Sequence, residues 1–347
     1  MTSLTIVCAC VVMFSNTLAL DARYDELVAR YTDAATVNGS RTTESTSSSA
    51  SRVNSPEPRV IYQRSVSKWL TSGNSYAGET TRWMSRDSEI EAGSPGRGVR
   101  IVWDGKRLTE LHTSEEKPDR NTVVVSDDPL DAAASRASGA SDAVLDGLLG
   151  GERTPLTLVL SSAERADVSA AITTSDGVDR PLLQATHPTG KYSVTLDPEH
   201  GYLPMRVHVV KSGENELNGV KISELFKAHL DAAGRPALVL VTLDLHDIEF
   251  KEIDGRWLPM SGVCESTYEY ADGSQETERL EVIRSSVIGG EGLPRDGFVH
   301  SIPNGTPVRF RHPPDAVPRQ WQDGEIVPRV NQQELDAIRH NLDHGTR

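Results

Sequence analysis

The dipeptide Asp-Gly occurs seven times in this chain of 347 residues, and several copies separate two runs of alternating apolar and polar residues. Gly adopts a positive φ angle without steric cost, and Asp is one of the few other residues that tolerate it. Asp-Gly therefore favours the tight turn of a β-hairpin. The stretch "IVWDGKRLTEL", residues 101–111, shows this pattern. The chain is predicted to be built from antiparallel hairpins.

The longest strand is predicted at residues 237–253, "ALVLVTLDLHDIEFKEI". Its apolar residues first occupy odd positions, at Val239, Val241, Leu243 and Leu245, and then even positions, at Ile248 and Phe250. Side chains of a strand alternate between its two faces, so one core face is kept only if an extra residue is inserted. We therefore expect a β-bulge at His246-Asp247, with both of these side chains directed toward solvent.

Asp254-Gly255 and Asp272-Gly273 join this strand to two more, at 256–270 and 274–287, in a three-strand meander. A sheet with one apolar face needs a layer that covers it. Two segments are predicted to be helical and to supply this layer: 21–35, with Tyr24 and Tyr31 on its apolar face, and 142–150. The predicted fold class is mainly β (α+β), a large curved antiparallel sheet or incomplete β-barrel with a few covering helices.

Composition divides the chain into four regions. The Ser/Thr-dominated stretch after the first helix has almost nothing to bury and is predicted to be flexible. The last region is rich in Pro, with a small hairpin and a short helix that begins at Asn331. The predicted regions are a signal peptide (1–19), the helix and flexible segment (20–58), the β domain (59–290) and the C-terminal extension (291–347).

The apolar run at residues 4–14 is too short to span a bilayer and precedes small residues that end at Ala19, as in a cleavable signal peptide. We therefore expect an exported protein with no transmembrane segment in the mature chain. A lipid anchor at Cys10 is an alternative. The net charge of −14 argues against nucleic acid and anionic membrane surfaces as partners.

No motif for nucleophilic catalysis is complete. The pattern G-x-S-x-G is approached at residues 73–77 and 139–143, but Ala replaces the last Gly in both. Glu265, Glu269, Glu276 and Glu278 lie on facing predicted strands, as chance pairs in a chain with 50 acidic residues. We predict that the protein is not an enzyme; a hydrolase that uses Ser75, Ser141 or His246 is an alternative.

No metal or cofactor is expected. The densest candidate for metal ligands is "DLHDIE" (Asp244, His246, Asp247 and Glu249), which is interpreted as the solvated face of the bulged strand. Outside the leader the chain contains a single cysteine, Cys264, which shares a predicted face with Leu258 and Met260. It is interpreted as a buried core residue.

Three stretches, "VWDGKRLTEL", "YSVTLDPEHGYLPMRV" and "IEFKEIDGRWLPMSGVCESTYEYADGSQETERLEV", are similar in order to the outer-membrane lipoprotein carrier (LolA/LolB-like) superfamily. The chain most resembles divergent exported members of that group, over roughly residues 60–288. The resemblance implies an incomplete barrel of about eleven strands with helices over an apolar cavity that holds acyl chains. It also implies the periplasm of a bacterium with an outer membrane.

Two functions are thus expected from the sequence and the resemblance, besides the hydrolase alternative. The first is an exported binding protein that holds an acyl chain or other apolar ligand, with the handling of envelope lipids or lipoproteins as the expected process. The second is an interaction, scaffold or sensor module of the cell envelope with a filled barrel and a protein partner. The candidate residues that line the cavity are Ile101, Trp103, Val194, Met205, Val207, Leu243, Leu245, Leu258 and Met260.

Overall fold

The computed structural model describes residues 23–329, with gaps, and residue 340. The gaps are 37–39, 54–58, 73–74, 87–89, 92, 130, 133–134, 137–139, 141, 150–153, 165–166, 176, 218–219, 226–235, 291–301 and 312–317. The predicted signal peptide (1–19) and the helix that begins at Asn331 lie outside the described residues.

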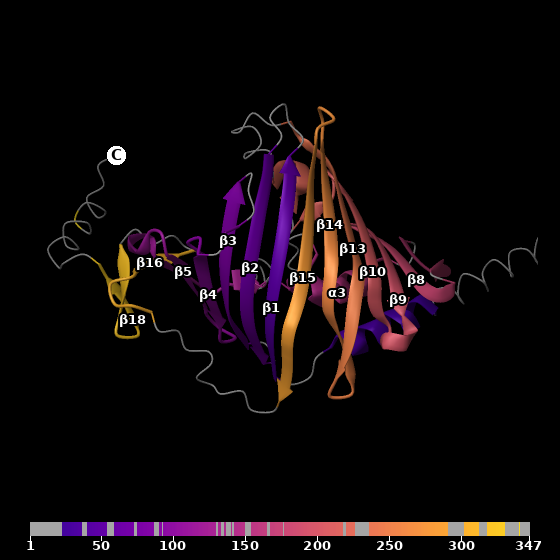
Figure 1. The fold of residues 1–347 in the computed structure, drawn as a ribbon, viewed down its shortest axis with the longest axis horizontal. Helices are drawn as coiled ribbons and strands as arrows, with labels where there is room; N and C mark the ends of the chain where they lie inside the picture. The colour runs from indigo at the N-terminus through magenta and orange to yellow at the C-terminus, as the bar shows by residue number, and fades with distance from the viewer. Residues whose placement is uncertain are drawn as a thin grey trace, which may run out of the picture.

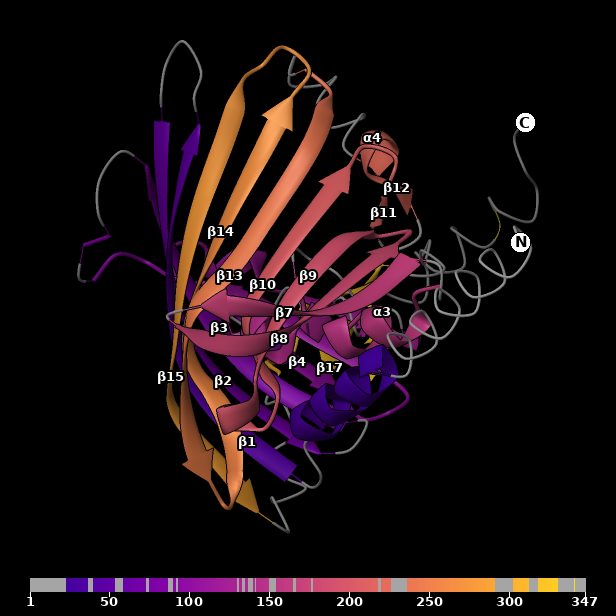
Figure 2. The same cartoon turned by 90° about the vertical axis from the view of Figure 1, so that its right-hand side faces the viewer.

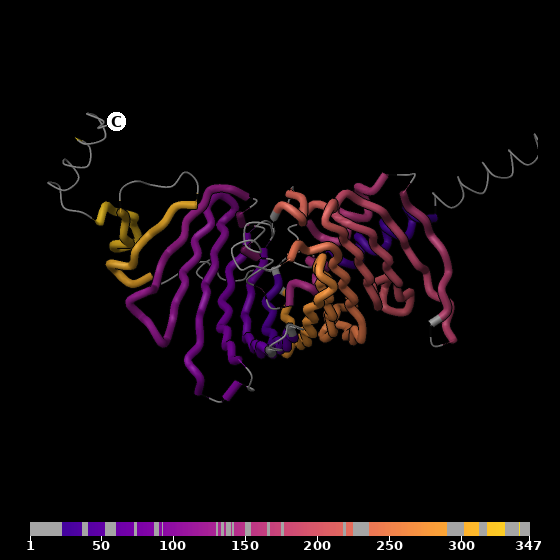
Figure 3. The backbone as a smooth tube through the Cα atoms, turned by 90° about the horizontal axis from the view of Figure 1, so that it is seen from above, coloured from indigo at the N-terminus to yellow at the C-terminus, as the bar shows by residue number. Residues whose placement is uncertain are grey.

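Sixteen strands of the described chain form one curved sheet, which is not closed (Figures 1 and 3). Its order is β18-β17-β16-β6-β5-β4-β3-β2-β1-β15-β14-β13-β10-β9-β8-β7, so that β18 and β7 are the two edges. Neighbouring strands are antiparallel except β6 and β16, which are parallel. The predicted fold class, a large, open and mainly antiparallel sheet with a few helices, is confirmed.

The first nine strands of the large sheet in chain order are β1 (Ser40–Val53), β2 (Arg59–Ser72), β3 (Ser75–Arg86), β4 (Arg97–Trp103), β5 (Leu108–Ser114), β6 (Thr122–Ser126), β7 (Val168–Ser175), β8 (Val178–His187) and β9 (Gly190–Asp197). The others are β10 (Leu203–Ser212), β13 (Leu238–Ile253), β14 (Arg256–Tyr270), β15 (Gln275–Gly290), β16 (Pro307–Phe310), β17 (Arg319–Gln322) and β18 (Glu325–Pro328). A small second sheet pairs β11 (Glu216–Leu217) with β12 (Val220–Lys221).

The helical elements include a helix over 23–35, α3 (Leu156–Ser162), α4 (Ile222–Leu225) and the short 3-10 helices η1 (Pro118–Arg120), η2 (Ala143–Asp146) and η4 (Pro198–His200). Residues 129, 131–132 and 135–136 are also helical.

Four of the seven Asp-Gly pairs lie at hairpin turns in the described chain: 104–105, 254–255, 272–273 and 323–324. Asp254 and Gly255 both have positive φ, 52° and 75°, as a tight two-residue turn requires. The turn of the first predicted hairpin is different. It is a four-residue loop at 104–107, in which the carboxylate of Asp104 accepts hydrogen bonds from the backbone N–H groups of Lys106 and Arg107.

The Ser/Thr-rich segment forms a strand over Ser40–Val53, so the prediction that this part of the chain is flexible is wrong. β1 lies in the middle of the sheet, paired with β15 on one side and β2 on the other. Its backbone hydrogen bonds are satisfied by both neighbours, and this pairing does not depend on apolar side chains. Ser45, Ser47 and Ser49 are buried on one face of the strand.

Hydroxyl groups stabilise this polar part of the sheet. Ser47 and Ser65 lie opposite each other with their Oγ atoms 3.0 Å apart, and Ser67 Oγ lies 2.8 Å from Thr80 Oγ1. A buried hydroxyl without a partner costs free energy, so these mutual hydrogen bonds explain how serines can occupy an interior face.

The main apolar core lies between the other half of the sheet and a helical layer on its concave side (Figure 2). Tyr24, Leu27, Val28 and Tyr31, all buried, place the predicted face of the first helix in this core. α3 belongs to the same layer and was not foreseen. A second core surrounds Trp69, Ile101 and Trp103, and a third, smaller one surrounds Val123 and Val308.

The predicted bulge in β13 is confirmed. His246 pairs with Val263 and Glu249 with Ser261, so that two residues of β13 face a single residue of β14. Asp247 has a positive φ of 53° and a side chain that is 74% exposed. His246 is half-buried and contacts Asp247, so it is less exposed than expected.

Val239 does not share the inward face of the strand. It is 50% exposed, whereas Leu238 is buried. The register between β13 and β14 shifts between Leu238 and Leu240, which turns Val239 outward.

The described strands of the predicted C-terminal extension, β16, β17 and β18, belong to the large sheet. β16 pairs with β6, and Val308 packs in the third core. β17 and β18 form the small hairpin that was expected. No helix of the described chain is both long and apolar enough to cross a membrane.

Candidate ligand-binding cavity

A cavity of about 300 Å³ lies between the helical layer and strands β10, β13 and β14. Small-molecule sites range from about 300 to 1,000 Å³, so this cavity is at the small end of that range. It is lined mostly by apolar side chains, with a group of charged side chains on one side.

The sheet side of the cavity depends on the β13 bulge. Leu245 precedes the bulge, and Ile248 and Phe250 follow it, yet all three line the cavity. Without the inserted residue, Ile248 and Phe250 would face the other side of the sheet. Leu258 and Val207 complete this wall from β14 and β10.

The helical side is formed by the end of the first helix and by residues 144–148 and 155–157. Gly147 ends η2 with φ +80°, the left-handed conformation that favours glycine. A Cβ atom at this position would lie 3.2 Å from Cβ of Leu156 and 3.3 Å from the hydroxyl of Tyr31. Gly147 therefore allows η2, α3 and the first helix to approach closely around the cavity.

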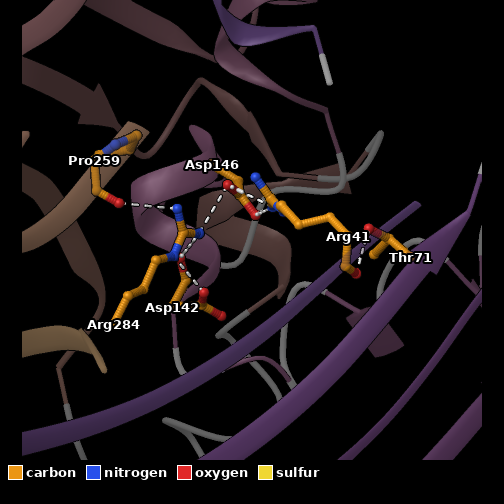
Figure 4. Close-up of polar contacts among 6 residues, drawn as sticks. All are labelled: Arg41, Thr71, Asp142, Asp146, Pro259 and Arg284. Carbon is orange, nitrogen blue, oxygen red and sulfur yellow. Dashed lines mark hydrogen bonds and ion pairs between the residues drawn. The ribbon is translucent and has the colours of Figure 1, made fainter. Parts of the chain in front are cut away.

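A network of two arginines and two aspartates lies at the polar side of the cavity (Figure 4). Arg284 of β15 donates from Nε to Asp142 at 2.6 Å and from Nη2 to Asp146 at 2.8 Å. Arg41 of β1 donates to both carboxylate oxygens of Asp146, at 3.1 and 2.9 Å. The network joins the middle of the sheet to η2, which carries part of the cavity wall.

The charges of the network determine the protonation of Asp146. Burial would raise the pKa of its carboxyl group, but the positive charges of Arg284 and Arg41 outweigh burial and hold this pKa well below its usual value. Asp146 is therefore a carboxylate whose charge is balanced by two guanidinium groups.

Three of the nine predicted lining residues, Val207, Leu245 and Leu258, line this cavity. The other six do not, although all were expected on one inward face. Val194 and Leu243 are buried in the main core, and Ile101 and Trp103 belong to the second core.

Met205 and Met260 lie at register shifts, where they have no partner in the strand pairing. Pro204 pairs with Leu196 and Arg206 with Thr195, which leaves Met205 between them. Met260 is left out in the same way between Pro259 and Ser261. Simple alternation fails at such positions, and both side chains are only half-buried.

The helical and charged residues of the site were missed from sequence. Asp146 and Gly147 belong to the segment 142–150 that is predicted to be helical, but nothing in the sequence places this segment beside β15. Arg41 was hidden in the segment predicted to be flexible. Its partner strand β15 follows more than 230 residues later, so no local pattern connects the two.

The other candidates for chemistry lie apart from the cavity. Asp244 forms an ion pair with Arg206, and Glu265 with Arg279. Ser75 begins β3, and Ser141 is outside the described residues. Among the described side chains, no group of three or more His, Cys, Asp or Glu could hold a metal ion.

Cys264 is buried as predicted, 5% exposed in the main core. Burial raises the pKa of its thiol to about 12. The thiolate, which is the reactive form, is therefore scarce at neutral pH.

No model of a protein family and no curated protein matches this chain. Among solved structures it is similar to a LolA superfamily protein from Nitrosomonas europaea, at 11% identity over 80% of this chain and 97% of that chain, with a TM-score of 0.35. It is also similar to lipovitellin, described with its lipid-protein interactions, at 11% identity over 75% of this chain and 26% of that one, with a TM-score of 0.33. Because these TM-scores are low, the description of this chain depends on its own sheet and cavity.

Proposed function

We propose that this chain is an exported, non-enzymatic binding protein that holds an acyl chain or another apolar ligand in the cavity on the concave side of its sheet. The observation that carries the proposal is the cavity itself, an apolar space of about 300 Å³ within an otherwise packed core. Protein interiors normally leave few voids larger than a water molecule, so a space of this size favours a ligand.

The shape of the walls supports a flexible apolar ligand. Leu245, Ile248 and Phe250 provide a strip of apolar surface along one strand, opposite Leu145 and Leu156 of the helical layer. Burial of each methylene group on such surfaces contributes about 0.8 kcal/mol. The small volume favours one chain over a lipid with two.

The proposed place of action is the periplasm of a bacterium with an outer membrane, with envelope lipid or lipoprotein handling as the process. This part is supported by the apolar run at residues 4–14 and by the resemblance of the hairpin sequences to lipoprotein carriers. It would be tested by cell fractionation of the full chain with and without residues 1–19.

The binding proposal is tested by titration with an environment-sensitive fluorescent acyl probe. We expect saturable binding, and we expect the variants Leu258→Trp and Ile248→Trp to weaken it by about tenfold or more, because a filled cavity no longer buries two or more methylene groups of the chain. Both residues are half-buried, so that the larger side chain can be accommodated without disrupting the core.

The matched control is Ile283→Trp, at a position that is 56% exposed and does not line the cavity. This variant should bind the probe like the unmodified protein. Absence of saturable binding, or equal loss in all three variants, would contradict the proposal. Native mass spectrometry of the protein purified from its envelope provides a second readout, since a ligand should co-purify.

A second candidate is an envelope interaction, scaffold or sensor module. It is favoured by one observation: much of the concave side is occupied by the packed side chains of the main core. A partner could then add a strand to the edge strand β7, where Ile172 is 46% exposed. This function would be supported if no acyl probe bound and if Ile172→Lys abolished crosslinking to a defined envelope protein.

A further inference from the structure

The charged residues beside the cavity do not balance one another. Arg41 and Arg284 are paired with Asp142 and Asp146, so these four side chains are neutral together. Arg136 also lines the cavity and lies close enough to Asp146 to lower the pKa of its carboxyl group. Three guanidinium groups therefore face two carboxylates, which leaves one positive charge.

Arg136 has no carboxylate partner among the described residues. Its guanidinium carbon lies 6.0 Å from the centroid of the Tyr76 ring, which is at the outer limit of a cation–π contact. The carboxylate of Asp146 already accepts three hydrogen bonds from Arg41 and Arg284, and none joins it to Arg136 among the described residues. The donors of Arg136 are thus available to a ligand.

From this geometry we infer that the ligand is a single-chain amphiphile with an anionic head group, whose oxygen atoms bind Arg136 while its chain lies between β13 and the helical layer. The inference rests on the proposed function and specifies its ligand class. A planar guanidinium group can donate two parallel hydrogen bonds to a carboxylate or a phosphate, and such bonds are stronger than those between neutral groups. Partial shielding from water at the cavity strengthens the attraction between Arg136 and an anionic head group.

The experiment compares three ligands with the same chain, dodecanoate, dodecyl phosphate and dodecanol, by calorimetric titration below their aggregation concentrations. Dodecanol tests the apolar cavity alone, and the two anions distinguish a carboxylate from a phosphate head group. We expect at least one anion to bind about tenfold more tightly than dodecanol, which corresponds to about 1.4 kcal/mol, and this preference to fall as salt concentration rises.

The variant Arg136→Gln should weaken binding of the anion more than binding of dodecanol, which has no charge, and so remove the preference for the anion; Arg136→Lys should restore part of the preference. Arg64→Gln is the matched control, because Arg64 is exposed on β2 and does not line the cavity.

The outcomes separate the two claims. If none of the three ligands binds, the proposed function fails. If all three bind with equal affinity, or if Arg136→Gln keeps the preference for the anion, the cavity binds apolar chains and the inference about Arg136 is wrong.

Discussion

Nε of Arg284 donates a hydrogen bond to Oδ2 of Asp142 at 2.6 Å, and the two side chains are 0% and 3% exposed. The bond joins β15, in the middle of the sheet, to the residue that precedes η2. It therefore fixes η2, which carries part of the cavity wall, to the sheet.

Replacement of Arg284 by Met should lower the free energy of unfolding by about 3–5 kcal/mol, because it leaves Asp142 buried without a partner. Arg279→Met is the control, since Arg279 pairs with Glu265 at the surface and such pairs contribute about 0–1 kcal/mol. Urea unfolding measures both. Equal losses for the two variants would show that the buried pair has no special role.

The low pKa of Asp146 predicts sensitivity to acid. In the unfolded chain an Asp has a pKa of about 3.9, whereas the arginines hold the pKa of Asp146 below this value in the folded chain. The unfolded state therefore takes up this proton first as the pH falls, so the stability due to Asp146 is complete above about pH 5 and is lost progressively at lower pH.

Asp146→Asn should consequently be less stable than the unmodified protein at pH 7, and its stability should fall less steeply between pH 5 and pH 2. The measurement is the free energy of unfolding at a series of pH values. If the free energy of unfolding falls equally steeply between pH 5 and pH 2 in both proteins, the low pKa of Asp146 is contradicted.

β1 should behave as a central strand in solution. The backbone amides of residues 41–51 pair with β2 and β15, so we expect slow hydrogen exchange comparable to that of β14. Mass spectrometry of peptic fragments would measure it. The exposed loop at 104–107 provides a fast-exchanging reference in the same sample. Exchange of β1 as fast as this loop would restore the interpretation as a flexible linker.

The bulge in β13 can be tested at Asp247. Its φ of 53° is accessible to Gly and Asn but costs a β-branched residue about 1–2 kcal/mol. Asp247→Val should therefore be destabilised by that amount, and Asp247→Gly should differ little from the unmodified protein. Thermal unfolding of both variants measures the difference. If Val is tolerated as well as Gly, the backbone at this position is not left-handed.

Features that depend on a few neighbouring residues could be predicted from the sequence, and features that depend on residues far apart in the chain could not. The hairpin at Asp254-Gly255 and the bulge at His246-Asp247 were predictable, because turn chemistry and strand alternation act within a few residues. β1 was not, because both of its faces are polar and its pairing with β15 spans more than 230 residues.

The cavity was predictable only in part, for a related reason. Val207, Leu245 and Leu258 were found from alternation along their strands. Arg41 and Arg136 were not, since their place beside the cavity depends on how β1 and the helical residues before η2 pack in the fold.

The most direct test of the binding account is photocrosslinking with a fatty acid that carries a diazirine on its chain, followed by peptide mapping. The account predicts adducts on the peptides that contain Leu145, Ile248 or Leu258, and their loss in excess unlabelled dodecanoate. Adducts confined to exposed positions such as Ile283 or Met84, or adducts that excess dodecanoate does not reduce, would contradict it.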